Sequence, residues 1–278
     1  MKYKLIATDL DGTLNNDSFQ ITEDNAKAIK KALDTGIKVV ICSGRSPSSL
    51  YSYEAFLGLN TQGNYGIGFN GSTVYESDSK KVIFKESIEK ELAVKIINTI
   101  RSIDENARLS VYLENDHLIS DKGLEEILAQ YNTDGQVKID FYPKITDDLI
   151  KKDVQNMYCI DYRPKLLEIY EGLKKNDITG CTMAFTQENL LEFLPVSMNK
   201  AHGLRKLCKH LGISLNQVVA VGDNYNDIEM LQASGFAIAV ANAVPQVKDV
   251  ADYVTKRDNN THSMVEIVDL IIKENKKL

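Results

Sequence analysis

Residues 4–13 read KLIATDLDGT, and this stretch indicates the fold class. Residues 4–8 have the β-rich, mostly apolar character of a short buried strand. Asp9 and Asp11 follow it, so both carboxylates can project from the carboxyl edge of a sheet, where open α/β folds bind ligands. Gly12 then permits a sharp turn. An isolated acidic pair of this kind is more often a solvated turn or a helix cap, so the rest of the chain decides its meaning.

Short strands alternate with helices on both sides of this stretch. A helical pattern that ends at Gly36 is followed by residues 37–42, which are mostly apolar in both alternating phases. That pattern is typical of a strand covered on both faces of a parallel sheet. The same design returns in residues 218–221 and 236–240. We therefore predict an α/β fold with a doubly wound, mostly parallel, Rossmann-like core sheet.

The middle of the chain has a different pattern. A helix is expected at about residues 87–102, and residues 109–113 and 156–160 alternate apolar with polar side chains. Helical patterns at about 124–131 and 164–174 interrupt these strands. The pattern predicts a smaller α+β domain, inserted into the core, whose antiparallel sheet has helices on one face and leaves the other face free.

Composition excludes several classes of partner. The formal net charge of -6 and the pI near 5.4 provide no overall basic field, so nucleic acid is not an expected partner. The apolar run Leu5–Ala7 is too short for a signal peptide or a membrane span, so we expect a cytoplasmic protein with no membrane partner. The four cysteines have no CxxC spacing and are expected to be reduced core residues (Cys42, Cys159, Cys181 and Cys208).

Two further segments offer groups that bind phosphate. Ser43 and Gly44 end the second strand, and Pro47 is well placed in the first turn of a helix, so a hydroxyl, backbone N–H groups and a helix dipole could converge on an anion. Lys200 begins the helical pattern 199–211 and could supply the fixed positive charge that a phosphoryl group needs. Taken singly, each is more often an ordinary helix cap or a solvated lysine.

A second acidic cluster, GDNYND at residues 222–227, follows another apolar strand. It offers the hard oxygen ligands that magnesium prefers. Asp223 is the best candidate ligand, and Asp227 is a candidate for holding the others in place. Together with Asp9, Ser43 and Lys200, this cluster completes the set of groups that phosphoryl transfer to a carboxylate requires.

As a set, these motifs resemble the haloacid dehalogenase (HAD) superfamily: DxDGT, a strand ending in Ser or Thr, a lysine, and GDxxND. Phe69-Asn70-Gly71 before the insert and Ala241-Asn242-Ala243 near the end resemble the Cof-type subfamily with a type IIB cap. The resemblance implies a HAD-like catalytic core domain formed by residues 1–84 and 196–278. Residues 85–195 would form an inserted α/β cap domain that sets substrate specificity.

The resemblance also implies roles for particular residues. Asp9 would attack phosphorus, and Asp11 would protonate the leaving alkoxide and then activate water. Mg²⁺ would be held by Asp9, the backbone carbonyl of Asp11, and Asp223. The phosphate would be bound by Leu10 through its N–H, Ser43, Gly44, Lys200 and Asn226, with Asp227 and Asn70 in supporting roles. An alkoxide leaving group needs a proton, so the second carboxylate favours a phosphatase over the dehalogenases of the superfamily.

The leading hypothesis is a Mg²⁺-dependent phosphatase that hydrolyses a small phosphorylated metabolite, such as a sugar phosphate, through an aspartyl-phosphate. Three alternatives are a phosphomutase-like phosphotransferase, a phospho-accepting signalling module like a receiver domain, and a phosphosugar-binding regulator without activity. A receiver needs neither Asp11 nor the long insert, which disfavours that reading. The sequence leaves the oligomeric state open.

Two local features depart from common motifs. Residues 66–71 match GxGxxG, but Ser72–Tyr75 looks extended, whereas a dinucleotide site needs a helix there, so NAD binding is not expected. Residues 258–263 lack a glycine that relatives often have in that loop, and Ser43 stands where many relatives have threonine. Both substitutions leave the proposed chemistry intact.

Overall fold

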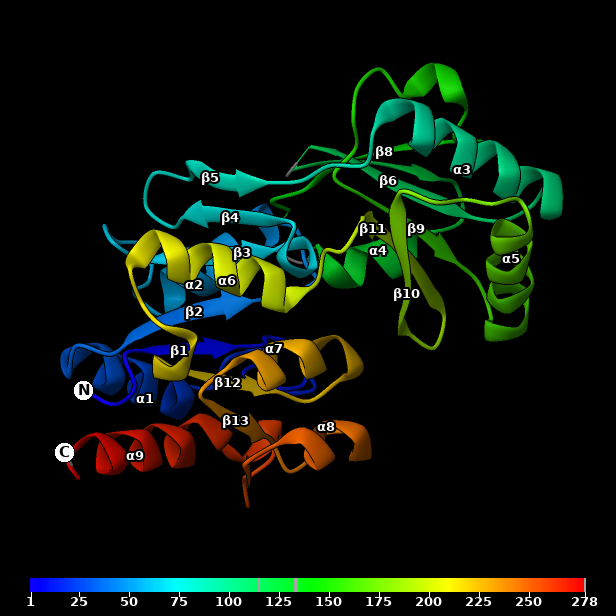
Figure 1. The fold of residues 1–278 in the computed structure, drawn as a ribbon. Helices are drawn as coiled ribbons and strands as arrows, with labels where there is room; N and C mark the ends of the chain where they lie inside the picture. Colours follow the sequence, from blue (N-terminus) through cyan, green and yellow to red (C-terminus); the bar gives the residue numbers. More distant parts are fainter. Residues whose placement is uncertain (115, 133–134, 278) are drawn as a thin grey trace. The chain divides into compact units, whose positions relative to one another are not determined.

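The protein divides into two compact units in a computed structural model that describes residues 1–114, 116–132 and 135–277 (Figure 1). The first unit consists of Met1–Arg45, Leu50–Lys85 and Asn199–Leu278. The second consists of Ser46–Ser49 and Glu86–Met198. Each unit has its own sheet, so the two are described separately.

The first unit contains an eight-stranded sheet in the order β14-β13-β12-β1-β2-β3-β4-β5. Its strands are β1 Leu5–Thr8, β2 Lys38–Cys42, β3 Tyr65–Gly68, β4 Thr73–Glu76, β5 Val82–Lys85, β12 Val218–Gly222, β13 Phe236–Ala239 and β14 Tyr253–Val254. Every pairing from β14 to β3 is parallel, and β4 and β5 add two antiparallel edge pairings. All residues of β1 are buried although their side chains alternate between faces, so both faces are covered. The doubly wound prediction is confirmed.

Six helices in the described part of the chain accompany this sheet. Their bounds are α1 Glu23–Asp34, α2 Tyr51–Phe56, α6 Lys200–Leu211, α7 Ile228–Ala233, α8 Pro245–Val250 and α9 Ser263–Asn275. Helix α1 packs against α9, although the two are distant in sequence, and α6 packs against α7. Short 3-10 helices of this unit lie at Phe69–Gly71, Leu215–Gln217, Tyr225–Asp227 and Asn259–Thr261, and a further one, Ser48–Leu50, spans its boundary with the second unit. One hydrophobic core, which includes Ile6, Val40 and Val219, joins the central strands to these helices.

The second unit contains a six-stranded sheet in the order β10-β11-β9-β6-β7-β8. Its elements are α3 Lys90–Ile103, β6 Leu109–Glu114, β7 His117–Asp121, α4 Glu125–Tyr131, β8 Lys138–Tyr142, a 3-10 helix Asp147–Leu149, β9 Asn156–Ile160, α5 Arg163–Lys175, β10 Cys181–Gln187 and β11 Leu190–Pro195. The predicted antiparallel pairing is found except between β7 and β8, which run parallel. Helix α4 connects these two strands and makes the crossover that parallel pairing requires.

Helices lie on both faces of the second sheet, so the prediction of one free face is wrong in part. Val111 and Met157 on one face pack into the core formed with α3 and α5. Leu118 and Ile160 point to the opposite face and form a smaller cluster with Leu124 and other residues around α4. The apolar residues Leu124 and Leu128 explain this placement, because residues four apart share one side of a helix. Helix α3 also begins later than predicted, because Ile88 pairs its backbone with Val154.

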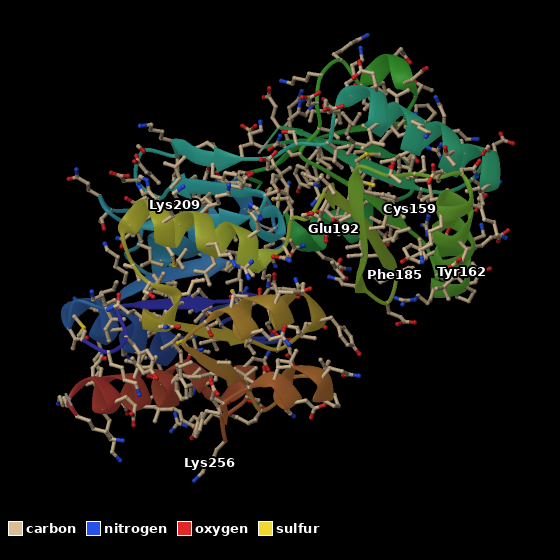
Figure 2. All side chains as sticks on the ribbon, viewed as in Figure 1. Cys159, Tyr162, Phe185, Glu192, Lys209 and Lys256 are labelled. Carbon is tan, nitrogen blue, oxygen red and sulfur yellow. The ribbon has the colours of Figure 1, made fainter. Side chains whose placement is uncertain are left out.

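Three of the four cysteines are buried, as predicted, and Cys181 is only partly buried. All four are free thiols. Burial raises the pKa of Cys159 to about 12, so this thiol stays protonated at neutral pH. Figure 2 labels Cys159 on β9 and Glu192 on the neighbouring strand β11. Within the described residues, no helix combines the length and apolar character that a membrane crossing would require.

The glycines of residues 66–71 serve packing. A Cβ atom at Gly66 would lie 2.3 Å from the Tyr75 hydroxyl and 2.4 Å from Glu54 Oε1, so Gly66 makes room for a buried polar pair. A Cβ atom at Gly71 would lie 2.1 Å from the carbonyl oxygen of Asn199, just before α6. Strand β4 follows, as the sequence predicts, and the helix of a dinucleotide site is absent there.

We expect Gly71→Ala to lower the free energy of unfolding by at least about 3 kcal/mol, because it combines overpacking against Asn199 with a left-handed backbone at φ +93°. Gly58→Ala is the matched control, since Gly58 also has positive φ (+70°) but its Cβ would meet nothing within 4 Å. The control should lose only about 1 kcal/mol. Urea unfolding of both variants measures the difference, and equal losses would show that the close approach is unimportant.

Glu54 provides a pH-dependent test of the core. It is buried and accepts hydrogen bonds from the hydroxyls of Tyr75 (2.8 Å) and Ser77 (3.0 Å). Burial raises the pKa of Glu54 above its ordinary value of 4.5, so the folded state binds a proton more tightly than the unfolded state. Stability should therefore fall as pH rises from 4.5 through the raised pKa. Urea unfolding of wild type and Glu54→Gln should show wild type losing stability relative to the variant across this window; a constant gap would contradict the expectation.

Candidate active site

Three neighbouring strands bring the predicted residues to one sheet edge. Thr8, the last residue of β1, lies opposite Ile41 in β2 and Val221 in β12. Because the three strands run parallel, the segments after them begin side by side. Asp9, Ser43 and Asp223 are the first residues of interest in those segments. The fold therefore brings them to the carboxyl edge, as the sequence predicts.

A buried lysine joins two of the carboxylates. Lys200 Nζ lies 2.5 Å from Asp9 Oδ1 and 2.6 Å from Asp227 Oδ1. The Lys200 side chain is 0% exposed, as is that of Asp227, while that of Asp9 is 8% exposed. Burial alone lowers the pKa of Lys200, but the carboxylates of Asp227 and Asp9 outweigh it and leave that pKa above its ordinary value. Lys200 therefore carries a fixed positive charge.

Helix α6 positions Lys200 through its first turn. Asn199 caps the helix, and its side-chain oxygen accepts the backbone N–H of His202 at 2.9 Å. Gly203 faces Gly71 so closely that a Cβ atom at Gly203 would lie 2.7 Å from the Gly71 Cα. This contact places the start of α6 against the 3-10 helix Phe69–Gly71. Lys200 is the first residue of α6.

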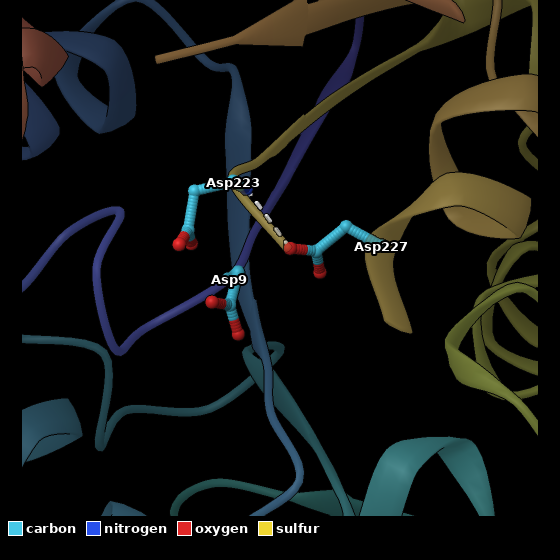
Figure 3. A group of neighbouring side chains, drawn as sticks. All are labelled: Asp9, Asp223 and Asp227. Atoms are coloured by element: carbon cyan, nitrogen blue, oxygen red, sulfur yellow. Dashed lines mark hydrogen bonds between the residues drawn. The ribbon is translucent and has the colours of Figure 1, made fainter. Parts of the chain in front are cut away.

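The loop after β12 holds the second acidic pair. Asp227 Oδ2 accepts the backbone N–H groups of Asp223 and Asn224, each at 3.0 Å. The Asp227 side chain folds back onto the start of its own loop. Gly222 leaves room for it, because a Cβ atom there would lie 2.5 Å from Asp227. Asp223 Oδ1 accepts a hydrogen bond of 2.6 Å from the Thr13 hydroxyl. Figure 3 shows the carboxylates of Asp9, Asp223 and Asp227 grouped together, with the bond from the Asp223 N–H to Asp227 dashed.

These three carboxylates fit a divalent cation. Each offers an oxygen within 4.8 Å of the others, and carboxylate oxygens suit magnesium. The three carboxylates against one ammonium leave an excess of negative charge in a buried place, which a divalent cation would offset. Lys200 occupies one oxygen of Asp9 and Thr13 one oxygen of Asp223, so each retains a second oxygen for an ion. Both oxygens of Asp227 are already bonded, which suits its predicted supporting role.

The crowding of acids perturbs their pKa values. Burial is the largest cause that raises the pKa of Asp9 well above its ordinary value; Lys200 opposes it, and the charges of Asp227 and Asp223 add to it. Burial and the charge of Asp227 raise the pKa of Asp223 to about 6. Perturbation of this kind is typical of functional sites in a cleft or at a sheet edge.

Asp11 has a different partner from Asp9. Arg45 donates from Nε to Asp11 Oδ2 at 2.6 Å and from Nη2 to Oδ1 at 2.7 Å. The Asn15 amide also donates to Oδ1, at 3.3 Å. The side chain of Asp11 is therefore held by Arg45 and Asn15. The resemblance implies that Asp11 would bind Mg²⁺ through its backbone carbonyl instead.

The other predicted phosphate-binding residues, and the supporting Asn70, come from several segments that follow strands of the sheet. Ser43 is buried and its Oγ accepts the Arg45 N–H at 3.1 Å. A Cβ atom at Gly44 would lie 3.0 Å from the Asn70 side chain, and Asn70 accepts a hydrogen bond of 3.0 Å from the Asn226 amide. Ser43, Gly44, Asn70 and Asn226 are thus brought together. Leu10 is buried between the two predicted catalytic acids.

The segment after Gly44 differs from the prediction. Pro47 does not open an α-helix; it precedes the 3-10 helix Ser48–Leu50, and α2 begins only at Tyr51. Helix α2 has six residues and no side-chain cap at its start. The helix-dipole contribution expected near Ser43 is therefore not supported.

Several residues that hold the site were not predicted. Thr13 was visible only as the last letter of DLDGT, and Arg45 only as the residue after Ser43-Gly44. Asn242 donates to the Gly12 carbonyl at 2.7 Å and accepts the Asn259 N–H at 3.0 Å, which ties distant loops to the first motif. His262, in the loop of residues 258–263, has a left-handed backbone, φ +64°.

A family model described as haloacid dehalogenase-like hydrolase matches residues 6–268, so the chain belongs to this family. Among its relatives, 5-amino-6-(5-phospho-D-ribitylamino)uracil phosphatase YcsE of Bacillus subtilis is 30% identical over 259 residues, which cover 91% of this chain and 89% of the relative. The protein is a HAD-type phosphatase, which confirms the enzyme class predicted from the motifs.

Solved structures have the same fold. TM0651 from Thermotoga maritima is 29% identical, superposes with a TM-score of 0.82, and is matched over 96% of this chain and 97% of that one. BT4131, a HAD subclass IIB sugar phosphatase, shares the fold with a TM-score of 0.78 at 20% identity, over 96% of this chain and 98% of that one. The predicted resemblance to the HAD superfamily is confirmed by the family model.

We expect Lys200→Met to lower the free energy of unfolding in EDTA by about 3–5 kcal/mol, because it leaves the buried carboxylates of Asp9 and Asp227 without their shared counter-charge. Lys209→Met is the matched control, since Lys209 lies exposed on the same helix (Figure 2). The control should change stability by no more than about 0.5 kcal/mol. Equal effects in urea unfolding would contradict the importance of the buried ion pairs.

Proposed function

We propose that the protein is a Mg²⁺-dependent phosphatase that hydrolyses a small phosphorylated metabolite, a sugar phosphate, through an aspartyl-phosphate on Asp9. The observation that carries the proposal is the group formed by the buried Asp9 and Lys200 and the partly buried Asp223 at the edge of a parallel sheet. A carboxylate nucleophile needs a neighbouring positive charge to approach an anionic phosphate, and this group provides one.

Asp9 would attack phosphorus with a carboxylate oxygen. Its bond to Lys200 keeps the side chain in one orientation and opposes the rise in the pKa of Asp9 that burial causes. The Ser43 hydroxyl, the Gly44 and Leu10 N–H groups and the Asn226 amide would bind the phosphate oxygens together with Lys200. The contact of Asn226 with Asn70 supports this arrangement, because it holds the amide beside Gly44.

Asp11 would carry out two proton transfers. In the first step the P–O bond of the substrate breaks, a bond from Asp9 to phosphorus forms, and Asp11 gives its proton to the departing alkoxide. In the second step Asp11 takes a proton from water, whose oxygen attacks phosphorus and releases Asp9. Inorganic phosphate and an alcohol are the products, and both aspartates return to their starting states.

Asp9, Asp223 and the backbone carbonyl of Asp11 would hold Mg²⁺. The chemistry that the ion supplies when bound is shielding of the anionic nucleophile from the anionic phosphate. The cluster of acidic oxygens within 4.8 Å of one another supports a cation at this place. Asp227 would serve by holding Lys200 and the backbone of residues 223–224.

The second unit would act as the cap that selects the substrate, in a cytoplasmic enzyme. Its own sheet and core support the role of an independent domain. Its long segment, Glu86–Met198, supports an inserted domain near residues 85–195, whereas its short segment, Ser46–Ser49, lies outside that insert. The sugar-phosphate class rests on the Cof-type resemblance, and a phosphomutase-like transfer to a second sugar hydroxyl is the alternative within the same site.

We expect purified protein to release inorganic phosphate from members of a sugar-phosphate panel and from p-nitrophenyl phosphate. EDTA should abolish release and Mg²⁺ should restore it, while Asp9→Asn should lower kcat by about 10³-fold or more, because it removes the nucleophile. Asp78→Asn makes the same chemical change at an exposed turn and serves as the control that should leave kcat unchanged.

Product analysis separates the two transfer reactions. Free phosphate and dephosphorylated sugar support the phosphatase, whereas a second phosphorylated isomer without free phosphate supports the mutase. Turnover by Asp9→Asn at the wild-type rate, or full turnover in EDTA, would contradict the proposed chemistry.

A further inference from the structure

Arg45 is the cation nearest to the predicted acid and base, and nothing in the proposed chemistry assigns it a role. Its guanidinium meets Asp11 as a two-pronged fork, with Nε 2.6 Å from Oδ2 and Nη2 2.7 Å from Oδ1. The Arg45 side chain is 8% exposed, whereas that of Asp11 is 33% exposed. A bidentate pair in which the cation is buried fixes geometry as well as charge.

The guanidinium is itself held from two sides. It lies 5.6 Å from the ring centroid of Phe19 and 5.5 Å from that of Tyr53, within range of cation–π attraction. The Tyr53 hydroxyl donates to the Phe19 carbonyl at 3.1 Å, which ties the two aromatic residues together. Phe19 adopts a left-handed backbone, φ 57°, which a non-glycine residue takes only at a cost. Phe19 and Tyr53 thus hold the Arg45 side chain in one position.

The backbone of Arg45 is fixed within the predicted phosphate-binding turn. Its N–H donates to Ser43 Oγ at 3.1 Å, and its carbonyl accepts the Phe69 N–H at 2.8 Å. Arg45 therefore links the segment that contains Ser43 to the side chain of Asp11. Any displacement of Asp11 would have to break two charge-assisted hydrogen bonds to a group that is itself immobilised.

The two oxygens of Asp11 are not equivalent. Oδ1 receives Arg45 Nη2 and the Asn15 amide, whereas Oδ2 receives Arg45 Nε. A carboxylate has about four lone-pair positions, so the fork leaves acceptor capacity on both oxygens and more of it on Oδ2. The fork consequently orients the carboxylate without blocking it, and Oδ2 is the oxygen better placed to exchange a proton.

We propose that Arg45 is the positioning residue of Asp11, and that both proton transfers of Asp11 depend on the orientation which the guanidinium fork imposes. This inference rests on the proposed function, because it concerns the acid and base of that reaction. Arg45 acts through Asp11: the departing alkoxide takes its proton from Asp11 in the first step, and attacking water gives its proton to Asp11 in the second.

Leaving groups of different basicity test the inference. p-Nitrophenolate departs without a proton, whereas a sugar alkoxide needs one. We expect Arg45→Met to lower kcat for the best sugar phosphate of the panel by about 30-fold, and to slow the first turnover of p-nitrophenyl phosphate by less than about threefold. Because hydrolysis of the aspartyl-phosphate still needs a base, p-nitrophenyl phosphate should then show a burst of p-nitrophenolate. Arg45→Lys should fall between wild type and Arg45→Met, since ammonium cannot form the fork.

A double-mutant cycle with Asp11→Asn separates positioning from other roles. If Arg45 acts through Asp11, the variant Asp11→Asn/Arg45→Met should be as active as Asp11→Asn alone. Additive losses, or equal slowing of the first turnover with both substrates, would overturn the inference. A raised KM for both substrates with unchanged kcat would also overturn it, because it would show that Arg45 binds the phosphate.

Controls distinguish failure of the inference from failure of the proposed function. Arg205→Met, on the exposed side of α6, should match wild type in all assays. Should Arg45→Met fail to fold by circular dichroism, the leaving-group comparison is made with Arg45→Lys. Absence of turnover by wild type, or absence of leaving-group discrimination in Asp11→Asn, refutes the proposed function. If Asp11→Asn slows the sugar phosphate more than p-nitrophenyl phosphate but neither Arg45 variant does so, only the role of Arg45 is refuted.

Discussion

The acidic residues at the sheet edge depend for their arrangement on the ion pairs that the buried ammonium of Lys200 forms with Asp9 and Asp227. Asp9 and Asp227 come from opposite ends of the chain, and each would carry an uncompensated charge in the interior without it. Removing a charge from water costs several kcal/mol, so the cluster is stable only when its charges are paired and hydrogen-bonded. Lys200 meets this condition for two carboxylates at once, and a divalent cation would meet it for the excess that remains.

That electrostatic requirement explains backbone features which otherwise look unrelated. Lys200 reaches the acids only if α6 starts close to the 3-10 helix Phe69–Gly71, and the facing glycines Gly71 and Gly203 allow this approach. Asp227 reaches Lys200 only if the loop after β12 turns back sharply, which Gly222 permits. The glycines lie where the charge cluster needs close backbone contacts. Substitution at these positions would shift the backbone segments that position Lys200 and Asp227.

The strands and the acids could be predicted from the sequence, because buried parallel strands leave a strong apolar pattern and the residues just after them share an edge. Asp9 and Asp223 were found in this way, and Lys200 was predicted from its place at the start of a helical pattern; the three are close together. Arg45 was not, since its importance depends on aromatic residues and a carboxylate that only the folded chain brings to it. The position of α4 was missed for a related reason: a seven-residue helix carries too little pattern to show which face of a sheet it covers.

The two carboxylates of the first motif, Asp9 and Asp11, have different cationic partners, Lys200 and Arg45. Asp9 and Asp11 are two residues apart, yet one lies beside a fully buried ammonium and the other in the fork of a guanidinium that is less buried. An ammonium is a compact charge without a preferred orientation, which suits a group that must remain anionic and attack. A guanidinium fork imposes orientation on its partner, which suits a group that must present one oxygen to successive protons. The choice of lysine for one carboxylate and arginine for the other therefore follows from the different work that the proposed reaction asks of each.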